Sequence, residues 1–91
     1  MLIKLTKPFK VKDKEVTEIE LDFEKLTGKQ LTDAEKEARA MGDRSPSVLV
    51  SMLYHSIIVA KIIGVPVDDV LAMNAADYKV LVSEAATFFL Q

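Results

Sequence analysis

Apolar and polar side chains alternate with a period of two over the first 23 residues, the pattern of β-strands with one face in water. The alternation falls into two runs separated by residues 12–14, which predicts a β-hairpin with a three-residue loop if both apolar sets share a face. That register sets three pairs opposite each other: Leu5 with Leu21, Ile3 with Phe23 and Lys4 with Asp22. Pro8 has no backbone N–H, so a bulge at this proline would change the register.

The two predicted strands carry opposite charges. Five lysines lie between Lys4 and Lys14, and five acidic residues lie between Glu15 and Glu24. A lysine-rich strand alone is compatible with phosphate binding. Here the facing acidic strand offsets the positive charge through cross-strand pairs, so we expect these charged side chains to form a solvent-exposed face instead of a phosphate site. Because a two-stranded ribbon is marginal in water, it must pack on helices or pair its edge with another chain.

After residue 26 the hydrophobic period changes to that of a helix. Residues 27–30 and 32–35 both match the capping box, so a helix begins at one of them and ends near Met41, with Gly42 as its C-cap. Its body is mostly charged, which predicts a partly exposed and weakly docked helix. Residues 42–47 then form the clearest mobile connection of the chain.

The segment from Ser45 to Gly64 is apolar on almost every side and predicts the most buried helix of the chain. Ser45 as N-cap and Pro46 at the first helical position supply the start signal, and Gly64 supplies the stop. On a helical wheel one apolar arc contains Val48, Leu49, Met52, Leu53, Val59, Ala60 and Ile63. A second stripe contains Val50, Tyr54, Ile57 and Ile58. Two interpretations remain open: a helix surrounded by the chain's own core, or a second stripe that faces another chain.

Two further helices are predicted towards the C-terminus. A turn led by Pro66 opens a short helix that Asp68 or Asp69 caps, and Asn74 caps the last helix. The last helix carries an amphipathic stripe made of Tyr78, Leu81, Val82, Ala85 and Phe89. Its end, residues 88–90, is bulky and apolar, so it either docks on the core or forms a hook for a partner, and docking is the favoured interpretation.

These elements predict an α+β fold in which an N-terminal β-hairpin precedes three to four helices packed as a small bundle. The 91 residues make a single domain, 1–91, with the hairpin in 1–24 and the helical part in 27–91. The net charge of −2 is not that of a nonspecific nucleic-acid binder, and the lack of cysteine fits a reducing compartment. Residues 48–63 fall short of the roughly 20 apolar residues of a membrane span, so we expect a soluble protein.

No catalytic constellation is present in the sequence. His55, the one histidine, has no nearby acid to orient it, which favours a satisfied core or interface imidazole over a base or metal ligand. Asp68 and Asp69 are better explained as helix caps than as metal ligands, and each of the three glycines lies at a helix boundary. We therefore expect no enzyme activity, no cofactor and no metal. The candidate partner-binding residues are Val50, Tyr54, Ile57, Ile58 and Phe88.

Several short motifs follow one another in a recognisable order. They are Ile3-Lys-Leu-Thr-Lys-Pro8, Val16-Thr-Glu-Ile-Glu-Leu21, Ala34-Glu35 before Gly42-Asp43, Ile62-Ile-Gly-Val-Pro66, Asp68-Asp69-Val-Leu71 and Ala76-Asp77-Tyr78. Over nearly the whole chain this order resembles the tail assembly chaperone family of long-tailed temperate phages and prophages, in particular the protein E group of Mu-like and P2-like phages. One departure is the hairpin turn, where members commonly carry glycine and this chain has Asp13-Lys14, which leaves the turn type open.

The resemblance implies a non-enzymatic assembly factor in the host bacterial cytoplasm. Such chaperones bind the tape measure protein, keep its apolar surface from aggregating, help to recruit tail tube subunits and are absent from the finished virion. The expected partners are therefore the tape measure protein and the tail tube protein, with a homo-oligomer as a further expectation and with neither nucleic acid nor membrane. The alternative is a small structural tail or head-completion protein that stays in the virion.

Overall fold

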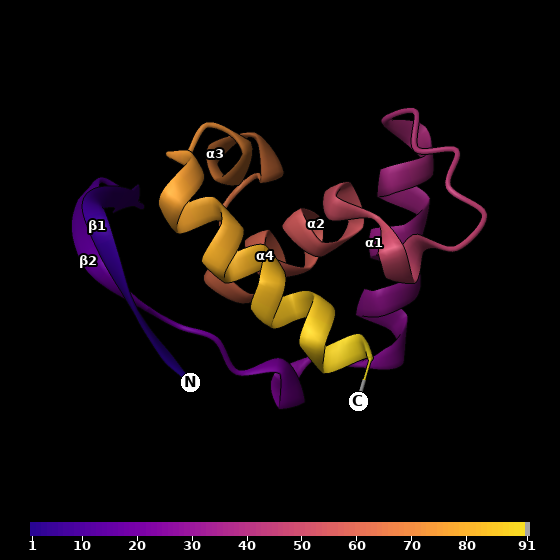
Figure 1. Ribbon diagram of the computed structural model, residues 1–91, viewed down its shortest axis with the longest axis horizontal. Coiled ribbons are helices and arrows are strands. Elements are labelled where there is room, and N and C mark those ends of the chain that lie inside the picture. The colour runs from indigo at the N-terminus through magenta and orange to yellow at the C-terminus, as the bar shows by residue number, and fades with distance from the viewer. Residues whose placement is uncertain (91) are drawn as a thin grey trace.

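The computed structural model describes residues 1–90 and confirms the predicted α+β fold. Two antiparallel strands, β1 (Leu2–Val11) and β2 (Lys14–Glu20), are followed by a 3-10 turn, η1 (Phe23–Lys25), and by helix α1 (Gly28–Ala40). A second 3-10 turn, η2 (Val48–Val50), leads into α2 (Met52–Ile63), α3 (Val67–Leu71) and α4 (Ala75–Phe89). The hairpin and α1 lie at opposite ends of the molecule, with α2 and α4 crossing between them (Figure 1).

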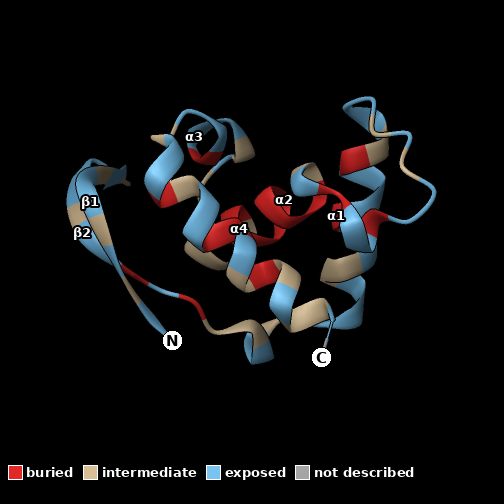
Figure 2. Ribbon diagram, in the orientation of Figure 1, coloured by how far each residue is buried: buried red, intermediate tan, exposed pale blue. Residues whose placement is uncertain are grey.

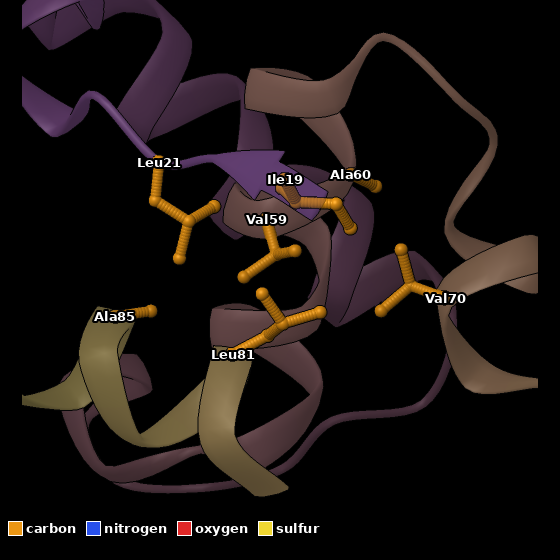
Figure 3. Close-up of a cluster of buried hydrophobic side chains, with 7 residues drawn as sticks. All are labelled: Ile19, Leu21, Val59, Ala60, Val70, Leu81 and Ala85. Atoms are coloured by element: carbon orange, nitrogen blue, oxygen red, sulfur yellow. The ribbon is translucent and has the colours of Figure 1, made fainter. Parts of the chain in front are cut away.

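Helix α2 is the centre of the structure, and its middle, residues 54–60, is buried (Figure 2). One of its sides faces the hairpin, α3 and α4. The side chains that meet there are shown in Figure 3 and are Ile19, Leu21, Val59, Ala60, Val70, Leu81 and Ala85. This first cluster covers the apolar face of the hairpin, so the hairpin is stabilised by packing on helices.

The opposite side of α2 packs against α1. Tyr54, Ile57 and Ile58 are buried there together with Ala34 and Ala38. The two alanines are four residues apart on one face of α1, and their small side chains let the helices approach closely. The hypothesis that this stripe faces another chain is therefore wrong for these three α2 residues, because the chain's own α1 covers them.

The start of α2 differs from the prediction. Ser51 is the N-cap instead of Ser45, and both Ser45 and Pro46 lie in the connection from α1. The hydroxyl of Ser51 donates a hydrogen bond to Asp43 Oδ2 at 2.5 Å and accepts one from the third helical N–H at 3.2 Å. This contact with Asp43, eight residues earlier in the chain, holds Ser51 at the start of the helix. At the other end Gly64 adopts a φ of 87° as the predicted C-cap.

The hairpin turn is shorter than predicted. Lys12 and Asp13 form it with φ values of 51° and 68°, so both central residues are left-handed, as a type I′ turn requires. The three pairs expected from a three-residue loop are therefore wrong. The observed pairs include Ile3 with Ile19, Lys4 with Glu18 and Phe9 with Val16. The second and third of these pairs follow different registers, because β1 is irregular between Lys4 and Phe9.

Pro8, where the sequence allowed a bulge, lies in the irregular stretch of β1 between Lys4 and Phe9, and Asp77 of α4 holds this stretch. The backbone N–H groups of Thr6 and Lys7 donate to the Asp77 carboxylate at 2.9 and 3.3 Å, and the Thr6 hydroxyl donates at 3.1 Å. Asn74 adds a side-chain donor at 2.8 Å. Burial alone would raise the pKa of Asp77, but the hydrogen bonds from Asn74, Thr6 and Lys7 outweigh it, and the net pKa is lowered.

The helix caps in the C-terminal half follow the prediction in part. Asn74 caps α4 by accepting the N–H of Asp77 at 3.1 Å, as predicted. The short helix α3 is also present, but its N-cap is Pro66, and no side chain caps it. The expected capping by Asp68 or Asp69 is wrong, because both residues lie inside the first turn, where their charge still favours the helix N-terminus.

We expect Ile58→Ser to destabilise the fold strongly and Val50→Ser to leave its stability nearly unchanged, although the sequence placed both residues on one stripe. Ile58 is fully buried between α2 and α1, so its replacement should lower the free energy of unfolding by about 3–4 kcal/mol. Val50 is 70% exposed, and its replacement should change that free energy by less than about 0.5 kcal/mol. Urea unfolding of the two variants measures both values, and equal losses would contradict the assignment.

A second prediction concerns the Asp77 bridge between α4 and β1. The pKa of Asp77 is lowered in the folded chain, so its ionised form stabilises the fold above the unfolded pKa of about 3.8, and this stabilisation is lost as the pH falls through the folded pKa. Asp77→Asn should lower the melting temperature at neutral pH. As the pH is lowered, the melting temperature of this variant should fall less steeply than that of the wild-type chain. The exposed Asp69→Asn is the control, and an Asp77→Asn melting curve that matches it would contradict the bridge.

Candidate partner-binding groove

Several large apolar side chains remain exposed, and four of them surround one groove between η2, the start of α2 and the end of α4. They are Leu49 (41% exposed), Val50 (70%), Met52 (59%) and Leu90 (71%). The groove has a volume of about 380 Å³, and Val82 and Ala86 of α4 also line it. A contiguous exposed apolar patch of this kind is typical of a protein interaction surface.

The turn η2 presents two of these side chains because its first residue is anchored. Val48 is buried in the cluster between α1 and α2, whereas the next two residues, Leu49 and Val50, face outward. Ser47 caps the turn by accepting the Leu49 N–H at 3.3 Å, and the N–H of Ser51 closes it on the Val48 carbonyl at 2.9 Å. The apolar rim is thus attached to a fixed backbone.

The connection before η2, predicted to be mobile, is tied down by Asp43 and Arg39. The Arg39 guanidinium donates to the Ser45 carbonyl at 2.5 Å, and the Ser45 N–H donates to Asp43 Oδ1 at 2.8 Å. Hydrogen bonds from Ser45 and Ser51, assisted by the Arg39 charge, lower the pKa of Asp43 to about 2. The carboxylate therefore stays ionised at neutral pH and keeps the start of α2 in place.

His55 lies at the base of the groove and is almost completely buried. Its ring stacks on Phe89 with centroids 5.7 Å apart and meets Tyr54 edge-on at 5.9 Å. Burial lowers the pKa of His55, and the nearby Leu49 carbonyl opposes this in part without closing a hydrogen bond to the ring. The expectation of a satisfied core imidazole is therefore wrong in one respect, because within residues 1–90 Nδ1 has no partner.

Two polar residues of α4 complete the lining. Lys79 and Ser83 are exposed and four residues apart, so they share one face of the helix. Among the side chains that the structure describes, Lys79 has no ion-pair partner. The described lining also holds no acidic residue, so the groove is apolar with one positive charge at its edge.

The predicted candidates separate into three groups. Tyr54, Ile57 and Ile58 are core residues, while Val50 lies at the groove. Phe88 is partly buried and stacks on Phe23 at a centroid distance of 5.0 Å, so it docks the end of α4 on η1, in agreement with the favoured interpretation. Partner binding by Val50 and Phe88 stays a prediction.

Sequence reasoning missed Leu49 and Met52, which it assigned to the core arc. That assignment assumed one continuous helix from residue 46, whereas the chain turns at η2 and the helix begins at Met52. The available signal was the serine pair at 47 and 51, because both residues act as caps. A helix that begins only after the second serine gives the residues before it no place on the helical wheel.

A second, open concavity of about 650 Å³ lies between the hairpin and α3. Its charged lining includes Lys7, Lys10 and Lys12 but also Asp13 and Asp69, so it has no single sign. Over the described part of the chain no cluster of three or more potential metal-ligating side chains occurs. No helix within residues 1–90 is long and apolar enough to cross a bilayer.

Comparison with known proteins supports the resemblance seen in the sequence. Residues 2–90 match the family described as "Phage tail assembly chaperone proteins, E, or 41 or 14". No curated protein and no solved structure matches the chain. The family match covers nearly the whole chain, hairpin and helices alike.

The docked end of α4 gives a further prediction. Phe89 contacts Tyr54 and His55 with ring centroids 5.4 and 5.7 Å away, so Phe89→Ala should lower the free energy of unfolding by about 2–3 kcal/mol. Leu90→Ala, at the exposed next position, should change it by less than about 0.5 kcal/mol. Chemical denaturation measures both, and an unchanged stability of the Phe89 variant would mean that the helix end does not contribute to the core.

Proposed function

This chain belongs to the phage tail assembly chaperone family, and we propose that it acts by binding the tape measure protein in the host cytoplasm, without catalysis. The observation that carries the proposal is the groove rimmed by Leu49, Val50, Met52 and Leu90. A protein whose role is to cover apolar surface on another chain needs exposed apolar surface of its own, held on rigid elements.

The physical need for such a chaperone follows from the nature of its partner. A tape measure protein that is synthesised before its tube exists exposes apolar helix faces that would associate with one another. Several copies of a small acidic protein, each covering one stretch of helix, raise the solubility of that partner. Each contact should be of modest affinity, because tail tube subunits must later displace the chaperone, and it should depend only weakly on salt.

Co-expression tests the proposal. The wild-type chain should move the tape measure protein from the insoluble to the soluble fraction and copurify with it. The double variant Val50→Ser/Met52→Ser should lose this effect while it keeps the wild-type melting temperature, because both side chains are mostly exposed. Val80→Ser is the matched control, since Val80 is an exposed valine of α4 outside the groove.

Two results would contradict the proposal. One is a tape measure protein that stays insoluble with the wild-type chain. The other is a fixed stoichiometric amount of this chain in purified virions, which would favour the alternative of a structural tail or head-completion protein.

A further inference from the structure

We propose that the groove binds an apolar helix face that carries a carboxylate, and that Lys79 pairs with this carboxylate. The inference rests on the proposed function and adds the chemistry of the segment that is bound. The described lining of the groove carries one positive charge, that of Lys79, whereas the whole molecule has a net charge of −2.

The charge at the groove is unbalanced. Lys79 is the one charged residue of the described lining, and the acidic groups of residues 1–90 that form ion pairs do so elsewhere. An apolar partner that covered the groove would remove water from this ammonium group without replacing the lost hydrogen bonds, which is unfavourable. A carboxylate on the partner replaces them, whereas a basic side chain would be repelled.

A second polar group at the groove is also able to donate. The Ser83 hydroxyl is one helical turn from Lys79 and makes no hydrogen bond with a described residue, so both can reach the same carboxylate. The two donors Lys79 and Ser83, together with the lack of an acidic residue in the described lining, favour an acceptor-bearing ligand.

An amphipathic helix fits the apolar part of the groove better than an extended strand. The exposed apolar side chains come from a turn and two helices, and the described lining offers no free strand edge for β-augmentation. A helix that carries apolar residues at three- and four-residue spacing presents a continuous stripe to such a surface. An acidic residue at the border of that stripe would lie against Lys79.

Synthetic peptides test the inference directly. Three labelled helical peptides of about 16 residues, long enough to form a helix, carry the same leucine stripe and differ only at one central border position, which is Glu, Gln or Lys. Fluorescence anisotropy with the full chain should rank their affinities Glu, Gln, Lys, with the Glu peptide about threefold to fivefold tighter than the Gln peptide. Lys79→Glu should reverse the order, and Lys79→Gln should remove it.

Lys36→Glu is the matched control, because it makes the same change in net charge at an exposed helical lysine that does not line the groove. It should keep the wild-type ranking. Equal affinity of the wild-type chain for all three peptides would overturn the inference, and so would a ranking that Lys36→Glu changes as much as Lys79→Glu does. The co-expression result with the tape measure protein is independent of this ranking, so a failed inference and a failed chaperone function are distinguishable.

Discussion

The structure depends on the need to surround one helix. Helix α2 is apolar on almost all sides, and in a chain of 91 residues this requires nearly every other element as cover. Small residues make that possible on one side, where Ala34 and Ala38 bring α1 close, and the hairpin, α3 and α4 supply the other side. Apolar side chains that find no place around α2, such as Val50 and Leu90, then remain at the surface.

Local signals predicted much of the fold. Gly64 as the end of α2 and Asn74 as the cap of α4 act within a few residues, so the sequence reveals them. The capping box that starts α1 is also local, but the sequence left it open between residues 27–30 and 32–35, and the structure has it at Thr27. The predicted hairpin register was wrong because the turn has two residues instead of three and because β1 is irregular between Lys4 and Phe9. In that stretch the Thr6 N–H donates a hydrogen bond to Asp77, which lies 71 residues further along the chain. The alternation of apolar and polar residues in the strand does not indicate such a contact.

The candidate site was predicted less well for a related reason. Ser45, Ser47 and Ser51 are all acceptable helix caps, and the one that caps α2 is Ser51, whose hydroxyl donates a hydrogen bond to Asp43. A helix that starts at Ser45 places Val50 and Ile58 on one stripe, whereas the observed start leaves Val50 outside the helix. The general prediction of surplus apolar surface was right, and the residues assigned to it were mostly core.

The Asp77 bridge has a consequence for the order in which the chain folds. The bulge of β1 receives its hydrogen-bond acceptor only from α4, and the hairpin residues Ile19 and Leu21 share their cluster with Leu81 and Ala85 of the same helix. A hairpin that leaves the ribosome first therefore lacks both its acceptor and its apolar cover until the last helix has been synthesised. Folding of this unit therefore waits for α4, and the nascent N-terminal segment stays open to other contacts until that helix has been synthesised.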